Sequence, residues 1–368
     1  MRAARLSPAP AGVLHLLGSL EVGGKERAAL RLAARGRALG STHTLLLFDA
    51  PWRGAPIDLD PGSIPWRFAR RRPGIDLSLA RAVAGAVRDT GAHVVHAHNE
   101  TAIFYAALAR AMPAGRDLRV VGTFHTRPTY PRRVTRHAAQ AAFRFVHHAV
   151  AVSDEMAAWL TATRLVPRCE VIVNGIDLDR FAPAAGRDAR APVRFAALSR
   201  LAPVKRHVDL IDAFARVHAA LPGVRLSIHG AGPLEHEVRR LAATLPDAID
   251  FEGVTHDVPR ALGEADAFVI CSDHEGTPLA VLEAMAAGLP IVCTQVGGLP
   301  ALVGAHDAPD GCALIVPPRD PAALAHAMAC LARDAALRAR LGRNARARAG
   351  AFGFEREWQA YAALYGRA

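Results

Sequence analysis

The chain has 368 residues, of which 51% are hydrophobic and 21% charged, a globular composition that suits two domains of about 150–200 residues each. The net charge of +11 lies in the first half: residues 1–185 carry 25 Lys+Arg and 14 Asp+Glu, whereas residues 186–368 carry 20 of each. This asymmetry favours a polyanionic partner or an anionic membrane surface for the first half only. No apolar run approaches the ~20 residues that cross a bilayer, which excludes a membrane-spanning chain.

The five cysteines lack C-x-x-C spacing, and several fall in apolar runs. We interpret them as buried, reduced thiols of a cytoplasmic protein. Arg2 and Arg5 precede a short apolar segment, Val13–Leu17, and thereby imitate a signal peptide. That segment contains a histidine and is followed by no A-x-A cleavage site, so we predict a first strand instead.

A glycine loop follows this first strand and precedes a helix predicted over Lys25–Leu39 and a second strand over Thr44–Phe48. The loop contains Gly23 and Gly24, and glycine lets backbone N–H groups approach an anion closely. The loop is therefore a candidate phosphate cradle. A plain tight turn is the alternative interpretation.

Polar residues follow two further predicted strands. His98 and Asn99 come after Ala92–Ala97, and His125 comes after Val120–Phe124. Ligands collect at the carboxyl ends of strands in α/β sheets, so a neutral imidazole at His125 is a candidate ligand contact. His98 and Asn99 are candidates for the acceptor side, although His98 suits ligand contact and loop structure equally well.

A basic amphipathic helix is predicted between residues 131 and 148. Its candidate acceptor-side residues are Arg132, Arg133 and Arg136, and the run at residues 70–72 is a candidate for the same face. Such a helix suits a membrane surface or an anionic acceptor, and equally an ordinary surface helix of an arginine-rich protein. Residues 182–192 are the predicted linker.

The second domain opens with a strand at Phe195 and a loop that carries Arg200 and Lys205, followed by a helix predicted over His207–Leu221. Two cations beside a helix start suit a diphosphate, because arginine offers a fork of donors and lysine a point charge. Lys205 is one of only two lysines in the chain. Two solvated loop charges are the alternative.

Residues 265–298 predict a strand, a loop, a helix, a strand and a glycine turn. The strand spans Ala267–Ser272, Thr277 is the predicted N-cap, Pro278 the first helical residue, and Gly288 the C-terminal glycine. The N–H groups of Leu279 and of the residue after it lack helical acceptors, so an anionic or polar ligand is favoured there.

Two glutamates, Glu275 and Glu283, flank this helix start in an E-x7-E spacing. Both lie among apolar residues, where an unpaired charge is costly, and carboxylates accept hydrogen bonds from vicinal hydroxyls. Taken alone, Glu283 could instead be a solvated helix residue, and Glu275 a loop charge. Together, the two glutamates predict a binding site.

The E-x7-E spacing, the flanking EAMAAGLPIV and VGG, the R-L-x-x-x-K pattern and the GGxER loop resemble the family-4 retaining glycosyltransferases. The resemblance implies the GT-B fold: α/β, with two Rossmann-like domains facing a central cleft. We expect an acceptor domain over 1–185, a nucleotide-sugar domain over 186–350, and a final helix over 351–368 that packs back on the first domain. Ala301 departs from the family pattern, which commonly has glutamate there.

The resemblance also implies roles for the site residues. Arg200 and Lys205 would neutralise the leaving diphosphate, Glu275 would orient the donor sugar, Glu283 the ribose, and His125 the sugar from the facing domain. The remaining donor-side candidates are Gly23, Gly24, Val254 (through its backbone), Gly276, Thr277, Pro278 and Leu279.

We expect no required cofactor and no metal. Two D-x-D tripeptides, Asp58–Asp60 and Asp177–Asp179, are ascribed to chance. The co-substrate would be a UDP- or GDP-linked sugar, and the acceptor a glycan or lipid-linked hydroxyl in surface polysaccharide, lipopolysaccharide or glycolipid synthesis. We expect the protein in the cytoplasm, peripheral on the inner membrane face.

Two other classes stay open. One is a GT-B-fold sugar-nucleotide epimerase or phosphorylase. The other is a non-catalytic, basic membrane-surface or nucleic-acid-binding protein, although the glutamates would then have no purpose, and we expect no nucleic-acid partner.

Overall fold

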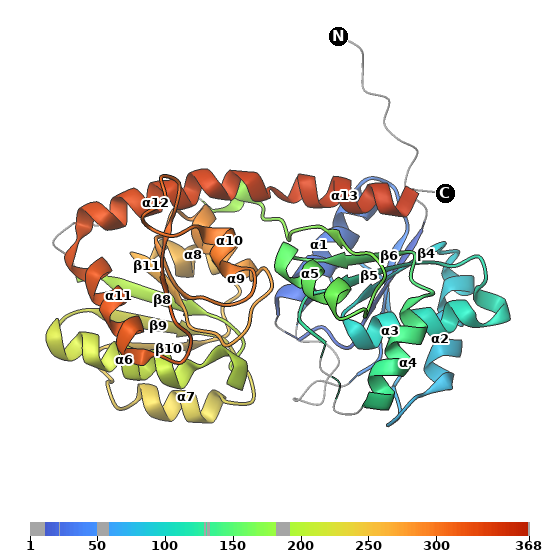
Figure 1. Cartoon of the computed structure of the whole chain (residues 1–368), viewed down its shortest axis with the longest axis horizontal. Coiled ribbons are helices and arrows are strands. Elements are labelled where there is room, and N and C mark those ends of the chain that lie inside the picture. The colour runs from blue at the N-terminus through green and yellow to red at the C-terminus, as the bar shows by residue number, and fades with distance from the viewer. Residues whose placement is uncertain are drawn as a thin grey trace, which may run out of the picture. The chain divides into compact units, whose positions relative to one another are not determined.

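A computed structural model describes residues 12–21, 23–49, 59–128, 130, 133–181 and 192–366. The chain divides into two compact units (Figure 1). Unit 1 comprises Met1–Val173 with Glu355–Ala368, and unit 2 comprises Asn174–Phe354. Each unit contains one parallel sheet with helices, so the predicted α/β class with two domains is confirmed.

Unit 1 contains a seven-stranded parallel sheet in the order β3-β2-β1-β4-β5-β6-β7. Its strands are β1 (Val13–Leu17), β2 (His43–Leu47), β3 (Trp66–Phe68), β4 (Val94–His98), β5 (Arg119–Phe124), β6 (His148–Ala151) and β7 (Glu170–Val171). The strand order reverses between β1 and β4, and ligands of doubly wound sheets bind outside the strand ends at such a point.

The helices of unit 1 are α1 (Gly24–Ala38), α2 (Leu77–Thr90), α3 (Glu100–Ala111), α4 (Arg133–Phe143), α5 (Asp154–Ala162), α13 (Phe354–Gly366) and the short 3-10 helix η1 (Pro113–Gly115). Local sequence sets their ends. Asp76 caps α2 by accepting from the Ser78 N–H, Gly91 ends α2 at φ 65°, and Ser153 caps α5.

Side chains of unit 1 alternate between the two faces of the sheet because successive strand residues point to opposite sides. One face packs apolar residues such as Leu16, Val95 and Phe124 against α2, α3 and α4. The other face carries polar residues as well. There His96 contacts the Tyr365 hydroxyl of α13 at 2.7 Å, which fixes the C-terminal helix on unit 1.

Unit 2 contains a six-stranded parallel sheet in the order β10-β9-β8-β11-β12-β13, with its reversal between β8 and β11. Its strands are β8 (Arg194–Leu198), β9 (Arg225–His229), β10 (Ile249–Gly253), β11 (Ala267–Ile270), β12 (Ile291–Thr294) and β13 (Ala313–Val316). Its helices are α6 (His207–Ala220), α7 (Glu235–Ala242), α8 (Val258–Gly263), α9 (Leu279–Ala286), α10 (Leu299–Val303), α11 (Pro321–Arg333) and α12 (Ala335–Ala349), with 3-10 helices η2 (Leu178–Arg180), η3 (Pro203–Lys205) and η4 (Gly350–Phe352).

Two apolar layers cover the sheet of unit 2. Phe195, Leu226 and Val292 lie in a cluster with α6 and α11, whereas Phe268 and Ile291 lie in a cluster with α8, α9 and α10. No helix in the described part of the chain combines the length and apolar character that crossing a bilayer requires.

The segment 174–181 packs in unit 2, although its sequence favours a place in the first domain. Asn174 Nδ2 donates to the Thr277 carbonyl at 2.8 Å, Ile176 forms a bridge with Gly353, and Arg346 donates to the Phe181 carbonyl at 2.7 Å. The unit boundaries therefore fall after residues 173 and 354 rather than after 185 and 350. The predicted linker lies outside the described residues, apart from residue 192.

Candidate functional site

The candidate donor site lies at the carboxyl ends of β8 and β11, the two neighbouring strands where the order of unit 2 reverses. The loop after β8 carries Arg200 and Lys205, and the loop after β11 carries Glu275. Parallel strands end at the same edge of a sheet, so these loops, which are far apart in sequence, meet there.

Gly230, in the loop after β9, positions the loop after β8. The Leu201 N–H donates to the Ala231 carbonyl at 2.9 Å, and a Cβ at Gly230 would lie 1.9 Å from the Ser199 carbonyl oxygen. Gly230 also has φ +150°, which L side chains rarely adopt. Only glycine therefore allows this close approach, which holds the backbone beside Arg200.

Lys205 and Glu275 form a direct ion pair. Lys205 Nζ lies 2.5 Å from Glu275 Oε1, and the Ser272 hydroxyl donates to the same oxygen at 2.5 Å. Glu275 is 6% exposed and Ser272 is fully buried. The structure thus joins the predicted phosphate-binding lysine to the predicted sugar-orienting glutamate.

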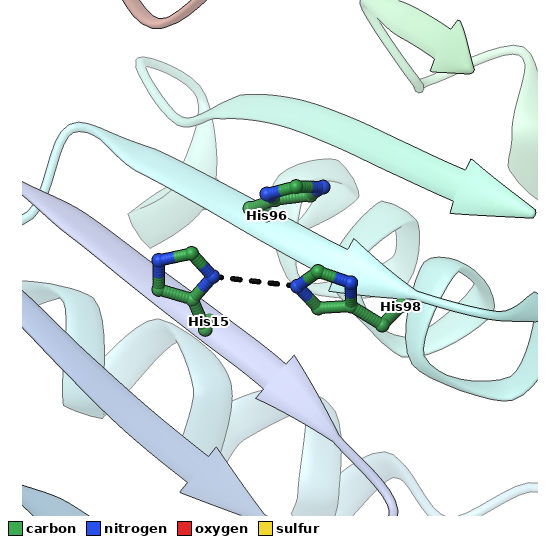
Figure 2. Close-up of side chains that lie close together, drawn as sticks. All are labelled: His15, His96 and His98. Carbon is green, nitrogen blue, oxygen red and sulfur yellow. Dashed lines mark hydrogen bonds between the residues drawn. The ribbon is translucent and has the colours of Figure 1, made fainter. Parts of the chain in front are cut away.

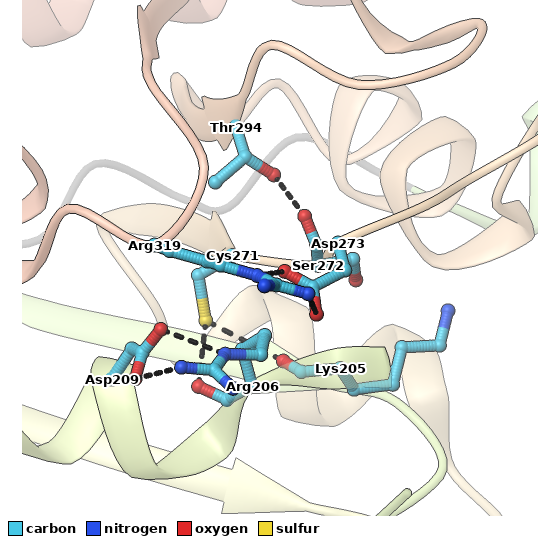
Figure 3. Close-up of polar contacts among 8 residues, drawn as sticks. All are labelled: Lys205, Arg206, Asp209, Cys271, Ser272, Asp273, Thr294 and Arg319. Atoms are coloured by element: carbon cyan, nitrogen blue, oxygen red, sulfur yellow. Dashed lines mark hydrogen bonds and ion pairs between the residues drawn. The ribbon is translucent and has the colours of Figure 1, made fainter. Parts of the chain in front are cut away.

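Further polar contacts fix the loop after β11 to the loop after β8, to the end of β12 and to the segment beyond β13 (Figure 3). The Cys271 thiol contacts the Arg206 carbonyl at 3.2 Å, and burial raises the pKa of this thiol to about 12, so it is neutral. The Thr294 hydroxyl donates to the Ser272 carbonyl at 2.7 Å. Arg319 forms a forked pair with Asp273, and its hydrogen bond lowers the pKa of that carboxyl group.

The helix α9 begins one residue later than predicted. The Pro278 carbonyl accepts from the Val281 N–H at 3.1 Å, and Pro278 has an extended ψ of 123°, so Pro278 and not Thr277 is the N-cap. Within the described residues, the N–H groups of Leu279 and Ala280 have no acceptor. These two donors belong to the first turn of α9, where an anion site is expected.

Glu283 lies inside α9 and is 8% exposed. The glycine turn after β12 packs on the other glutamate: a Cβ at Gly297 would lie 1.8 Å from the Glu275 carbonyl oxygen, and Gly297 has φ +52°. The predicted Gly288 follows α9 at φ 76°, as the helix end requires. The segment is therefore fixed at Glu275 by the turn at Gly297, and the helix that carries Glu283 ends at Gly288.

The other donor-side candidates of unit 2 lie in the loops that follow β8, β10 and β11. Arg200 is exposed just beyond β8, and Val254 is half-buried after β10. Gly276 and Thr277 are buried in the loop before α9. The structure places Lys205 and Glu275 in contact, and the assigned roles of all these residues remain predictions.

In unit 1, His125, His98 and Asn99 lie together at the ends of β4 and β5. His98 Nδ1 lies 3.2 Å from His125 Nε2, and the Asn99 side-chain oxygen accepts from the His125 N–H at 2.9 Å. Asn99 has φ 70°, an uncommon value for a residue with a side chain. The candidate ligand contact His125 is thus fixed through both its ring and its backbone.

The glycine loop lies directly before α1, and residue 22 within it lies outside the described part of the chain. Its role as a phosphate cradle remains a prediction. Gly23 is the N-cap of α1 with φ −164°, an extended value open to any residue. A Cβ at Gly23 would lie 2.4 Å from Glu26 Oε2, and Glu26 pairs with Lys25 at 3.0 Å. A side chain at Gly23 would meet only the flexible end of Glu26, which can shift, and Gly24 is exposed.

The acceptor-side arginines are only partly described. Arg136 is exposed on α4 and donates to the Thr163 carbonyl at 3.0 Å. Arg132 and the side chain of Arg133 lie outside the described part of the chain. Of the D-x-D tripeptides, Asp58 lies outside as well, whereas Asp177 caps η2 by accepting from the Asp179 N–H.

Sequence reasoning missed Ser272, which donates to Glu275, and the Arg319–Asp273 pair. Ser272 ends an apolar run just before the loop, and that position was the available signal. Arg319 had no such signal because it lies 46 residues from its partner. His15 and His43 were also missed, although each occupies an alternating strand position.

Two family models match the chain. Residues 22–180 match Glycosyltransferase Family 4, and residues 192–334 match Glycosyl transferases group 1, so that the two matches take in most of the chain. The chain belongs to these glycosyltransferases. The resemblance inferred from the E-x7-E and R-L-x-x-x-K motifs is confirmed.

Curated relatives agree with this membership. The chain is 31% identical over 300 residues to the D-inositol 3-phosphate glycosyltransferase of Streptomyces avermitilis, covering 75% of this chain and 60% of that protein. It is 31% identical over 243 residues to the GDP-mannose-dependent alpha-mannosyltransferase of Mycobacterium tuberculosis, covering 60% of each. The chain spans about half the length of the curated relatives it matches.

The fold is similar to that of Anabaena Alr3699/HepE, solved in complex with UDP and glucose. The TM-score is 0.79 with 21% sequence identity, over 97% of this chain and 100% of that one. At this identity the likeness concerns the fold alone. It confirms the predicted GT-B class, two α/β domains with parallel sheets.

Proposed function

We propose that this protein is a retaining glycosyltransferase that moves a sugar from a nucleotide-sugar to a hydroxyl acceptor. The observation that carries the proposal is the Lys205–Glu275–Ser272 cluster beside the start of α9 in a chain of this family. A cation suits a diphosphate, and so do helix N–H groups that have no acceptor among the described residues; a buried carboxylate suits the adjacent sugar hydroxyls.

In the proposed reaction, the bond between the sugar C1 and the diphosphate oxygen breaks, and C1 bonds to the acceptor oxygen on the same face. The acceptor's proton leaves with the diphosphate. Arg200, Lys205 and the N–H groups at the start of α9 stabilise the charge that develops on the diphosphate. Glu275 orients the donor sugar and Glu283 the ribose, while His125 is the proposed sugar contact from unit 1.

The relatives guide the choice of donor and acceptor. One is named a GDP-mannose-dependent mannosyltransferase, and a structural neighbour was solved with UDP and glucose. We therefore propose a UDP- or GDP-linked hexose as donor, the base contacting the backbone near Val254, and a glycan or lipid-linked acceptor in surface polysaccharide or glycolipid synthesis. Protein cations supply the charge neutralisation, so no metal ion is required.

A cytoplasmic, peripheral membrane location is part of the proposal. On α4, Arg136 is exposed, and Val134 is 68% exposed on the same helix. An exposed apolar side chain among arginines suits the surface of an anionic bilayer. Co-sedimentation with anionic but not with neutral vesicles tests this location, and the absence of binding to both would contradict it.

The test of the donor site is a thermal-shift panel of nucleotide diphosphates and nucleotide-sugars without added metal. We expect one nucleotide to stabilise the protein, and Lys205→Ala to lose that stabilisation. Arg216→Ala, which removes an exposed arginine of α6 in the same unit, is the matched control. A flat response across the panel would contradict the proposal.

The reaction itself is tested with the donor that this panel identifies. We expect transfer to a hydroxyl acceptor, with the anomeric configuration of the donor kept in the product. A donor epimer formed without acceptor would indicate an epimerase, and cleavage that depends on inorganic phosphate would indicate a phosphorylase. An inverted product would contradict the retaining mechanism.

A further inference from the structure

Four histidines of unit 1 form a continuous row of hydrogen-bonded rings. His43 Nδ1 lies 2.9 Å from His15 Nε2, His15 Nδ1 lies 3.3 Å from His98 Nε2, and His98 Nδ1 lies 3.2 Å from His125 Nε2. The four residues come from β2, β1, β4 and the loop after β5, which are spatial neighbours in that order. Figure 2 shows the central contact, between His15 and His98. The row ends at the proposed sugar contact.

The rings of this row are neutral near pH 7. Burial lowers the pKa of His15 and His98 well below the ordinary value, that of His43 to about 4, and that of His125 to about 3. A neutral imidazole has one N–H donor and one acceptor nitrogen. Each contact joins an Nδ1 to an Nε2, so the tautomers are linked: either all four rings carry the proton on Nδ1, or all four carry it on Nε2.

The far end of the row indicates which arrangement holds. His43 Nε2 is buried and has no hydrogen-bond partner among the described residues. It lies against Gly36 of α1, where a Cβ would be 1.9 Å away. A proton on His43 Nε2 would be a buried, unpaired donor, which native structures rarely contain. An unpaired lone pair there costs less than an unpaired N–H donor, so protons on Nδ1 are favoured throughout.

A metal ion is the competing explanation for part of this cluster. Ring nitrogens of His15, His96 and His98 all lie within 4.8 Å of one another. All six of their nitrogens already have partners, however: His96 contacts the Tyr365 hydroxyl at 2.7 Å and the Thr123 hydroxyl at 2.8 Å. A divalent ion would break these contacts and would find no carboxylate or thiolate in this group to offset its charge.

We propose that His98, His15 and His43 are positioning residues that hold His125 as a neutral imidazole with its proton on Nδ1. The consequence for transfer rests on the proposed function of His125 as a sugar contact. Because His98 donates to its Nε2, His125 presents an N–H donor and no free acceptor nitrogen. It therefore binds an oxygen of the sugar and does not remove the proton of the acceptor hydroxyl.

The decisive experiment is NMR of the full chain with ¹⁵N-labelled histidine, read through the two-bond couplings that distinguish the ring tautomers. Single His→Gln variants assign the signals. We expect His15, His43, His98 and His125 all to carry the proton on Nδ1. A mixture of tautomers within the row, or protons on Nε2, overturns the proposal. So does stoichiometric binding of added zinc that shifts the signals of His15, His96 and His98 together.

A matched pair of variants tests the positioning role. His98→Phe keeps a ring but removes the donor to His125, so we expect the His125 tautomer to change and kcat to fall about fivefold, the worth of one neutral hydrogen bond, with the donor KM little changed. His98→Asn offers an amide N–H near the Nδ1 position, and should restore both. An unchanged His125 tautomer in His98→Phe overturns the role.

The two proposals fail separately in these experiments. The tautomers are read in the wild-type protein without substrate, so the NMR result stands whether or not the protein transfers a sugar. It also needs no variant to fold beyond those used for assignment. Absence of glycosyl transfer with the expected tautomers would contradict the proposed function and leave the row intact.

Discussion

Lys205 Nζ lies 2.5 Å from Glu275 Oε1, although 70 residues separate the two in the chain. The carboxylate is buried and also accepts from Ser272, while the ammonium group keeps partial contact with solvent. A diphosphate bound at this edge would therefore compete with Glu275 for the lysine. Glu275 has two opposing effects in the proposed reaction. It orients the sugar, and it also pairs with the lysine that would otherwise bind the diphosphate.

Glu275→Gln is expected to separate these two effects. The neutral amide releases Lys205, so the affinity for the nucleotide diphosphate alone should rise about two- to fivefold, the worth of a partly exposed ion pair. Glycosyl transfer should fall about 100-fold, because the group that orients the donor sugar is lost. Calorimetric titration and initial rates measure the two quantities.

The control for this substitution is Glu264→Gln, which removes an exposed glutamate paired with Arg260 in the same unit. It should leave both the affinity and the rate unchanged. If Glu275→Gln transferred sugar at the wild-type rate, the proposed role of the glutamate would be wrong.

Gly297→Ala is expected to destabilise unit 2 and to displace the Glu275 loop. The added Cβ would lie 1.8 Å from the Glu275 carbonyl oxygen at φ +52°, so the free energy of unfolding should fall by about 1–3 kcal/mol. Urea denaturation measures the loss, and the donor KM should rise with it. Gly263→Ala is the control, because its Cβ meets no atom within 4 Å. Equal stability of the two variants would contradict the packing argument.

Stability is expected to decrease as the pH falls below about 6.5. Burial lowers the pKa of His43 and of His207 to about 4 in the folded protein, below the value in an unfolded chain. The unfolded chain therefore binds more protons below pH 6.5, and each such histidine reduces the free energy of unfolding by up to about 1.4 kcal/mol per pH unit.

Above that pH these histidines are neutral in both states and make no contribution to the pH dependence. Urea midpoints compared between about pH 7.5 and about pH 5 check the direction of the effect. His207→Phe, which removes one buried histidine of unit 2, should reduce the slope. A midpoint that does not change over this range would show that the buried rings take up protons without unfolding.

Metal removal is expected to leave transfer unchanged. In the proposed reaction Arg200, Lys205 and the start of α9 neutralise the diphosphate, the work that a divalent ion does in other enzymes. Rates measured after dialysis against a chelator, with and without added Mg²⁺ or Mn²⁺, check this expectation. An activity that is lost on dialysis and restored by one of the ions would make the metal-free mechanism untenable.

The helix and strands that carry the candidate site around Glu275 could be predicted from the sequence because they are close along the chain. An apolar run, a loop, Pro278 and Gly288 specify a strand, a turn and a helix through local preferences alone, and the structure has all of them. The error at Thr277 is one residue, because the choice between adjacent caps depends on which carbonyl accepts the first helical hydrogen bond.

Local preferences could not predict which distant groups meet. The contact between Lys205 and Glu275 depends on β8 lying beside β11, and the placement of 174–181 in unit 2 depends on partners about 100 residues or more away, Thr277 among them. In the same way, the row of histidines exists because β2, β1, β4 and β5 are adjacent and their alternating side chains share one face.

The sequence by itself determined the family, the alternation of strands and helices, and the candidate donor residues, since each rests on short-range pattern. Only the tertiary structure decided which carboxylate pairs with Lys205, which loops the glycines hold, and that His125 stands at the end of a row of buried rings. Strand order and register bring these groups together, and neither is encoded within a few residues of any one of them.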